Sequence, residues 1–335
     1  MRGHYLAPTP WFSFVLFKTS ILVAPSFLIM NRFQVTRAAN LLGYRLFPKV
    51  TNADARRFRD HLKYQCRLYP VQERLEYPTH REPIKPWAFI RAYNEISTIE
   101  ASLNSILPLI QNGVIAYNDC NDGTAEFIQK FCQKHPGFIP FHYPFQVFPS
   151  NSEEYKNKNL NYKNTLAAYY NAALSFIPRG EWVIKIDCDL VFFEEPLKWS
   201  LSLPQRDTDF VSFSRMDLAV INNEIRFIRY SRPNDHFLIK NDGFYFRNDS
   251  GYLPDGRFWA WEVLVRKPSR FIFPECSCLH FPFHKEWRPI PDYVKTYDLN
   301  SSLSSISKLE ISEELFNKNN IQSIVDSFKP INSNL

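Results

Sequence analysis

Short apolar runs alternate with amphipathic segments through the middle of this 335-residue chain. In the segments that separate the runs, apolar residues recur with the period of a helix. Strands that alternate with helices pair in parallel, with helices on both faces of the sheet. The pattern therefore predicts an α/β fold with a mostly parallel central sheet. The predicted strands are 87–91, 114–117, 138–141 and 182–187, and the predicted helices begin near residues 97, 122 and 165.

The first predicted helix has clear signals at its ends. Ser97 and Glu100 have the spacing of a capping box, in which each side chain binds a backbone N–H of the first turn. Ile99, Leu103 and the apolar residues that follow lie on one face. Gly113 is expected to end this helix.

The pattern changes on both sides of this central stretch. Beyond residue 190, two apolar runs at 218–221 and 225–230 flank Asn222-Asn223 and predict a hairpin. The pattern from 31 to 75 is helical, and prolines punctuate a linker from Pro78 to Pro86. We therefore expect three parts: a helical, basic region at 1–80, a main domain at 84–300 and a helical tail at 301–335.

Charge is distributed unevenly along the chain. Hydrophobic and charged residues make up 45% and 22% of it, as in ordinary globular proteins. The net charge is +6, yet residues 1–80 alone carry +8, so the remainder is slightly acidic. This distribution argues against a nucleic-acid groove and favours contact between the N-terminal region and an anionic membrane surface. The alternative is a basic helix that is merely solvated.

Residues 9–30 are apolar enough to raise the question of a membrane segment. Lys18 and Pro25 interrupt the run, so a clean spanning helix is not expected, and no signal-peptide cleavage site follows. An interfacial helix followed by a basic cluster fits a peripheral or monotopic protein better. That cluster is Arg56, Arg57, Arg59, Lys63 and Arg67. Alternatively, translation begins at Met30, which would leave residues 1–29 outside the native product.

Cysteine and glycine usage excludes several classes of site. The six cysteines form no CxxC pair and show no zinc spacing, which indicates free thiols in a reducing compartment. The nine glycines form neither GxGxxG nor a P-loop motif. A Rossmann dinucleotide site and a P-loop are therefore disfavoured.

An acidic doublet, Asp187 and Asp189, follows the predicted strand at 182–187. Ligands of open α/β sheets bind outside the carboxyl ends of the strands, and paired carboxylates there suit a divalent metal that binds phosphates. A second copy, Asp207 and Asp209, precedes its strand and lies at the wrong end of the sheet. The alternative for the first doublet is a solvated turn.

Three polar segments follow predicted strands and would meet along one edge of the sheet. They are Arg91-Ala-Tyr93-Asn94-Glu95, Asn118-Asp119-Cys-Asn-Asp122-Gly-Thr and Asp187-Cys-Asp189. With the Asn171-Ala-Ala173 element of the intervening helix, their order resembles that of GT-A glycosyltransferases, which use nucleotide-sugar donors.

Longer stretches are similar to bacterial lipooligosaccharide β-1,4-N-acetylgalactosaminyltransferases. The resemblance is dense over 84–240 and returns at 275–288. It includes Pro86-Trp-Ala-Phe-Ile-Arg91, Gly113-Val-Ile-Ala-Tyr-Asn-Asp-Cys120 and His280-Phe-Pro-Phe283. It implies a GT-A-like fold with a nucleotide-sugar half at 84–190 and an acceptor half at 191–300.

The resemblance also implies roles for single residues. Tyr93, Asn94 and Glu95 would line the uridine pocket, and Asp119 would accept from the uracil N–H. Arg91, Asp122 and Asn171 fall in the same donor-binding motifs. Three of these residues have structural alternatives: Tyr93 as packing at the sheet edge, Asp119 as a turn residue and Arg91 as the partner of a nearby carboxylate.

For the metal, the resemblance implies that Asp187 lies near the ribose and the ion, while Asp189 and His280 are ligands. Carboxylate and imidazole ligands together suit Mn²⁺, or else Mg²⁺. Apolar residues flank His280, so a core histidine is the alternative.

An inverting transfer also needs a general base, and three carboxylates are candidates. Asp235 is preferred and Glu262, which stands among aromatic residues, comes next. Glu275, five residues before His280, is the third.

We therefore expect an inverting glycosyltransferase on the cytoplasmic face of a bacterial inner membrane. It would move N-acetylgalactosamine from UDP-GalNAc to a galactose of the lipooligosaccharide outer core in β-1,4 linkage. Transfer of galactose or N-acetylglucosamine is the alternative within the class. A nucleotidyltransferase would also use paired aspartates and a metal, but it usually has a Gly/Arg/Lys-rich loop after its first strand. A non-catalytic carbohydrate-binding protein would not need the metal pair.

Overall fold

The computed structural model describes most of the chain from residue 66 onward. The described residues are 66–78, 81–149, 152–157, 159–231, 235–252, 258–266, 270–306, 308 and 310–330. The predicted membrane-associating segment, its basic cluster as far as Lys63, and Met30 lie outside them. Among the described residues, no helix has both the length and the apolar character of a membrane span.

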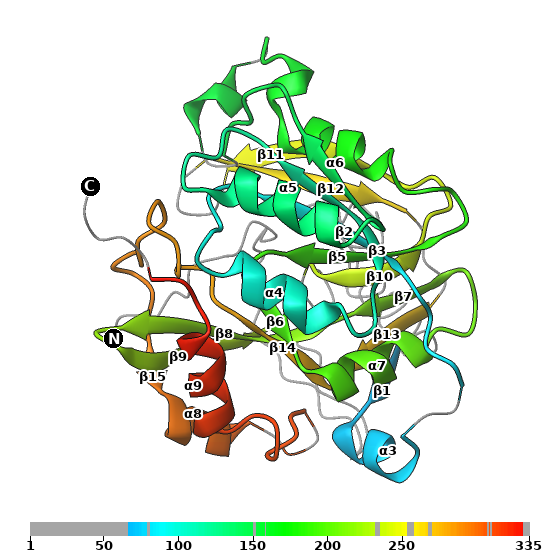
Figure 1. Ribbon diagram of the computed structural model, residues 1–335, viewed down its shortest axis with the longest axis vertical. Helices are drawn as coiled ribbons and strands as arrows, with labels where there is room; N and C mark the ends of the chain where they lie inside the picture. The colour runs from blue at the N-terminus through cyan, green and yellow to red at the C-terminus, as the bar shows by residue number, and fades with distance from the viewer. Residues whose placement is uncertain are drawn as a thin grey trace, which may run out of the picture.

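A large mixed sheet forms the centre of the described structure (Figure 1). Every strand runs in the same direction except β10, which is antiparallel to both of its neighbours. This arrangement confirms the predicted α/β class and its mostly parallel sheet. The strand order is β1 (Cys66–Tyr69), β13 (Arg270–Pro274), β7 (Asp209–Ser212), β10 (Phe237–Lys240), β5 (Trp182–Asp187), β2 (Trp87–Ala92), β3 (Asn112–Tyr117) and β4 (Phe138–His142).

Successive side chains of these strands point to opposite faces, and each face has its own core. Ile90 and Ile186 belong to the core that includes residues of α4 (Ile99–Ile106), α5 (Thr124–Lys134) and α7 (Glu194–Ser202). Phe89 and Val183 belong to the core that includes α6 (Leu166–Leu174) and the hairpin of β11 (Tyr245–Tyr252) and β12 (Phe258–Val265). Helices therefore cover both faces, as the sequence predicts. The 3₁₀ helices are Glu153–Lys156 and Tyr162–Asn164.

A second sheet extends from the carboxyl edge of the first. The chain passes from β5 into β6, from β7 into β8 and from β13 into β14, with at most two residues between the strands. Helices α8 (Leu299–Ser305) and α9 (Lys318–Asp326) contribute to its core (Figure 1). The strand order is β15 (Tyr297–Asp298), β9 (Glu224–Ser231), β8 (Ser214–Ile221), β14 (Cys276–His280) and β6 (Leu190–Phe192). The predicted hairpin around Asn222-Asn223 is β8–β9.

The N-terminal part of the description corrects one expectation. Residues 66–69 form a strand, β1, although the pattern from 31 to 75 predicts a helix. β1 pairs in parallel with β13, and Tyr69 is buried in the core, so sheet pairing overrides the local helical pattern. A short helix, α3 (Val71–Glu76), follows. The expected boundary at 80–84 therefore does not separate these residues from the main sheet.

The ends of α4 also differ from the predicted signals. The Ser97 hydroxyl donates to the carbonyl of His284 instead of capping the helix, and Thr98 occupies the N-cap. Gly113 does not end the helix but lies in β3. A Cβ there would come within 2.8 Å of Ala88 on the neighbouring strand, so the close approach of β2 and β3 requires glycine.

The two Asp-x-Asp copies lie at opposite edges of the sheet, as predicted. Asp209 begins β7 and is fully buried, where Arg270 donates to it at 2.9 Å. Asp187 ends β5. Asp209 thus joins β7 to β13 at the edge away from the candidate site.

Arg270→Met is expected to destabilise the fold by about 3 kcal/mol, because it leaves the buried Asp209 carboxylate without its cation. Urea denaturation measures the change. The control is Lys240→Met, which removes a partner of the exposed Asp207 and should cost less than about 1 kcal/mol. Equal losses for the two variants would show that the Asp209 pair contributes no more than a surface pair.

Candidate active site

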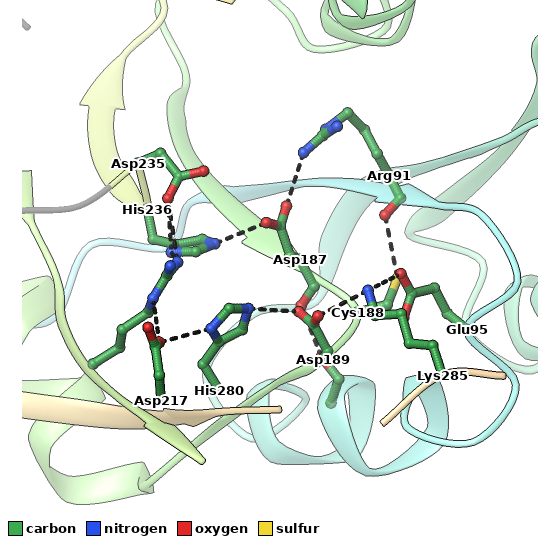
Figure 2. A network of polar contacts seen from close by, with 12 residues as sticks. Arg91, Glu95, Asp187, Cys188, Asp189, Asp217, Asp235, His236, His280 and Lys285 are labelled. Atoms are coloured by element: carbon green, nitrogen blue, oxygen red, sulfur yellow. Dashed lines mark hydrogen bonds and ion pairs between the residues drawn. The ribbon is translucent and has the colours of Figure 1, made fainter. Parts of the chain in front are cut away.

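Asp187 lies at the carboxyl edge of the main sheet, surrounded by cations (Figure 2). Arg91 is its cross-strand partner on β2 and donates to Oδ1 at 2.9 Å. Lys185, two residues earlier on the same face of β5, lies 3.5 Å from that oxygen. The other oxygen is 3.0 Å from Nε2 of His236. Arginine, lysine and histidine side chains thus hold Asp187 in place, and 26% of its own side chain is exposed.

His236 reaches this edge because β10 is antiparallel, so the residues before it meet the ends of the parallel strands. Arg215 Nη1 lies 2.8 Å from His236 Nδ1. Since a guanidinium only donates, Nδ1 accepts and Nε2 carries the proton that is donated to Asp187. Burial lowers the pKa of His236 although Asp235 and Asp187 oppose it, in keeping with a neutral ring.

Asp189 belongs to a second, deeper cluster. Lys285 Nζ lies 2.8 Å from its Oδ2, and Nε2 of His280 lies 3.4 Å from its Oδ1. The other ring nitrogen of His280 contacts Asp217 at 2.7 Å. Asp217 on β8 is the cross-strand neighbour of His280 on β14, so the second sheet sets this contact.

The cations keep both carboxylates of the doublet ionised. Burial alone would raise the pKa of Asp187, but Lys185 and Arg91 outweigh it and hold the pKa well below its usual range. Burial likewise opposes ionisation of Asp189, where Lys285 and the neighbouring imidazole hold the pKa well below its usual range. Ionised carboxylates are the form that binds metal.

The residues around Asp189 fit a divalent metal. Asp189 Oδ1 is buried and has no hydrogen-bond partner within the described part of the chain. When Nδ1 of His280 donates to Asp217, Nε2 is the ring nitrogen that faces this oxygen, and it can bind a metal once it has released its proton. A carboxylate that orients a ligating histidine in this way is typical of metal sites. Asp189 and His280 are therefore the residues that would hold Mn²⁺ or Mg²⁺.

A second set of potential ligands suits a metal less well. Ligand atoms of Asp187, Asp235 and His236 lie within 4.8 Å of one another. Lys185 and Arg215 already form ion pairs with the carboxylates of this set. Nε2 of His236 carries a proton and therefore offers no lone pair to a metal. These residues are better described as an internal ion-pair network.

The loops after β2 and β3 lie side by side, as expected for a nucleotide pocket. Asn94 and Asp119 both adopt positive φ, and the Asn94 side chain exchanges hydrogen bonds with Asn121. Asp119 is exposed at the end of β3. Tyr93 is 41% exposed and packs edge-on against Trp287 at 5.2 Å. Tyr93 and Asp119 are therefore open to a ligand, whereas both polar atoms of the Asn94 side chain bond to Asn121.

Glu95 differs from its neighbours because it is buried. It pairs with Lys285 at 2.5 Å, and burial raises its pKa to about 8 in spite of that cation. It is therefore a partner within the Asp189–Lys285 cluster rather than an open pocket residue.

Two residues of the expected donor-binding set have structural contacts instead. Asp122 accepts from the backbone N–H groups of Ile96 and Thr124, which joins the two loops. Asn171 bonds both backbone groups of Phe246 and thereby holds β11 against α6. Their polar atoms are occupied by the backbone, so they position the site from outside it.

The three candidates for the general base have different surroundings. Glu275 is buried and paired with Arg74 of α3, away from the network, so the expectation of a catalytic role is corrected to a structural one. Asp235 binds Lys185 through one oxygen and Arg215 through the other, at 3.2 Å each.

Glu262 is half-buried and accepts from the Tyr170 hydroxyl at 2.7 Å. The guanidinium of Arg91 stacks on the ring of Tyr170 at 3.7 Å from its centre. Glu262 thus lies one aromatic ring away from the Arg91–Asp187 pair.

The residues that bind the carboxylates of the site are not among those predicted from the sequence. Strands β5 and β8 are mostly apolar but contain the charged residues Lys185, Arg215 and Asp217. Charged residues within apolar strands are a signal of buried ion pairs. His236 directly precedes an apolar strand. Lys285 has no local signal, because its role depends on the fold of the C-terminal half.

Comparison with protein families assigns the chain to one of them. Residues 68–327 match the model of the β-1,4-N-acetylgalactosaminyltransferase (CgtA) family. The chain belongs to this family. It is therefore a glycosyltransferase, as the sequence resemblance implies. No curated protein matches the chain.

Two solved structures are similar at low identity. One is the inositol-1-phosphate CTP transferase from T. maritima, with 10% identity, a TM-score of 0.28 and coverage of 48% of this chain and 72% of that one. The other is GalNAc-T7 with UDP, GalNAc and Mn²⁺, with 12% identity, a TM-score of 0.29 and coverage of 55% and 30%. Scores of this size carry no argument, so the family assignment rests on the family match alone.

Asp189→Asn is expected to abolish Mn²⁺ binding and to lower activity at least about a hundredfold, because it removes the charge from a ligand without changing its shape. Circular dichroism should show a folded protein. The matched control is Asp207→Asn, in the second Asp-x-Asp copy, whose side chain is 74% exposed at the opposite edge. An Asp189→Asn enzyme with wild-type activity would remove the metal assignment.

Proposed function

We propose that this glycosyltransferase is metal-dependent and inverting, and that it transfers N-acetylgalactosamine from UDP-GalNAc to a galactose of a lipooligosaccharide in β-1,4 linkage. Family membership supports transfer of N-acetylgalactosamine. The observation that carries the mechanism is the pairing of Asp189 with His280 beside the loops of Asn94 and Asp119.

The reaction proposed is a single displacement. A hydroxyl of the acceptor attacks the anomeric carbon of the donor, the bond from that carbon to the diphosphate oxygen breaks, and a base takes the hydroxyl proton. A Mn²⁺ or Mg²⁺ ion held by Asp189 and His280 would neutralise charge on the diphosphate. Asn94 and Asp119 would bind the uridine, while the stack on Tyr170 fixes Arg91 beside Asp187.

Glu262 is the carboxylate proposed as the base, in place of the preferred candidate from the sequence. Both oxygens of Asp235 bind cations, and although burial opposes it, Lys185 holds the Asp235 pKa well below its usual range. An ion-paired carboxylate of this kind is a weak proton acceptor. Glu262 binds only a neutral hydroxyl among the hydrogen bonds described for it.

Glu262→Gln is expected to lower kcat by about 10²- to 10⁴-fold while the affinity for Mn²⁺ stays unchanged, because the amide cannot accept the proton. Steady-state kinetics and metal titration test this. Asp235→Asn is the comparison and should mainly lower stability, since it weakens the pairing of two cations. If Asp235→Asn folds normally yet loses more activity than Glu262→Gln, the base is Asp235.

The proposed place of action is the cytoplasmic face of a bacterial inner membrane, where the chain would be peripheral or monotopic. The excess of Lys and Arg in residues 1–80 supports this proposal, since a basic segment binds anionic lipids.

The donor is identified by incubating the protein with UDP-sugars, Mn²⁺ and a galactose-terminated acceptor. UDP release is expected with UDP-GalNAc and only when both metal and acceptor are present, and NMR of the product would give the linkage. Faster transfer from UDP-galactose or UDP-N-acetylglucosamine would change the donor assignment. Release of pyrophosphate from a nucleoside triphosphate would instead indicate a nucleotidyltransferase.

A further inference from the structure

Lys285 places a buried positive charge directly on the carboxylate proposed to bind metal. Its ammonium lies 2.8 Å from Asp189 Oδ2 and 2.5 Å from Glu95 Oε1, and only 5% of its side chain is exposed (Figure 2). Lys285 therefore joins the two carboxylates through buried ion pairs.

The two oxygens of Asp189 have unequal surroundings. Oδ2 binds Lys285, whereas the buried Oδ1 faces His280 and makes no hydrogen bond within the described structure. A divalent cation on Asp189 and His280 would share one carboxylate with the ammonium. Two like charges this close in a buried site repel each other.

The segment that carries Lys285 is tied to the loop after β2. Ser97 donates to the carbonyl of His284, and the Trp287 indole donates to the carbonyl of Asn94 at 3.1 Å. These bonds hold Lys285 between Glu95 of the nucleotide loop and Asp189 of the metal pair. Lys285 thus connects the two halves of the site.

From these contacts we propose that Lys285 is a positioning residue that holds Asp189 in the metal-free enzyme and competes with the divalent cation for it. The proposal rests on the metal site of the proposed function. Lys285 balances the charge of the buried Asp189 and bonds Glu95 when no metal is present, which keeps the site folded. The same ammonium weakens metal binding, so the metal binds weakly until the donor diphosphate adds its own negative charge and ligands.

Lys285→Met tests the proposal, because methionine has a similar length and no charge. Free Mn²⁺ is measured by electron paramagnetic resonance in a titration without nucleotide. The variant is expected to bind Mn²⁺ about tenfold more tightly than the wild type, as expected when a competing charge-assisted hydrogen bond is lost. Mn²⁺ should also raise its Tm more than that of the wild type.

The matched control is Lys329→Met. Lys329 is half-exposed, its backbone N–H donates to the carbonyl of Ser97, and its ammonium pairs with Glu100 rather than with Asp189. This variant removes the same charge from the neighbouring segment and should bind Mn²⁺ as the wild type does. If Lys329→Met tightens Mn²⁺ binding as much as Lys285→Met does, the proposal is overturned, because the effect then comes from the net charge of the protein.

A second comparison covers the case in which Lys285→Met alone fails to fold. On a Glu95→Gln background, Lys285→Met leaves only Asp189 without its ammonium partner, and it should again tighten Mn²⁺ binding relative to Glu95→Gln. Unchanged or weaker binding upon loss of Lys285 contradicts the competition while leaving the metal site intact. If neither the wild type nor Lys285→Met binds Mn²⁺, both the competition and the metal assignment of Asp189 and His280 fail.

Discussion

Burial of acidic side chains at the end of β5 is the constraint on which the rest of the site depends. An isolated buried carboxylate is strongly disfavoured, so each must be matched by a cation or a hydrogen-bond donor. Here acidic groups alternate with basic ones along a connected path. The path runs from Glu95 through Lys285, Asp189, His280, Asp217, Arg215, Asp235, Lys185 and Asp187 to Arg91. Removal of one member leaves each of its neighbours with fewer partners, so these residues are expected to act as a unit.

The topology brings these residues together from distant parts of the chain. Parallel strands of the main sheet deliver Arg91 and Asp187 to one edge, and β10, which runs antiparallel to its neighbours there, delivers His236 to the same edge. Three segments then continue into the second sheet, where Asp217 and His280 are cross-strand neighbours. The site therefore lies at the junction of two sheets, and neither sheet supplies it alone.

The sequence predicts the part of this site that local patterns encode. Apolar strands followed by polar residues place Asp187 and Asp189 correctly, and the position of Asp209 before its strand excludes the second copy. The ion-pair partners of the carboxylates are less predictable from the sequence, because they depend on which strands become neighbours in the sheets. Glu275 illustrates this: its spacing from His280 suggests catalysis, yet the pairing of β1 with β13 brings Arg74 to it. Asp122 and Asn171 lie within recognisable motifs, but their hydrogen bonds go to the backbone.

The two carboxylates of the doublet have different roles because they face different sheets. Asp187 is fixed by Arg91 and Lys185 of the main sheet, which leaves it little freedom to bind an ion. Asp189 follows the turn into β6 and meets His280 of the second sheet, with one oxygen lacking a hydrogen bond in the described structure. The first aspartate thus maintains the geometry of the edge, and the second is the one that the proposed function assigns to the metal. In this arrangement basic groups balance both carboxylates, while one oxygen of Asp189 keeps no hydrogen bond within the described structure.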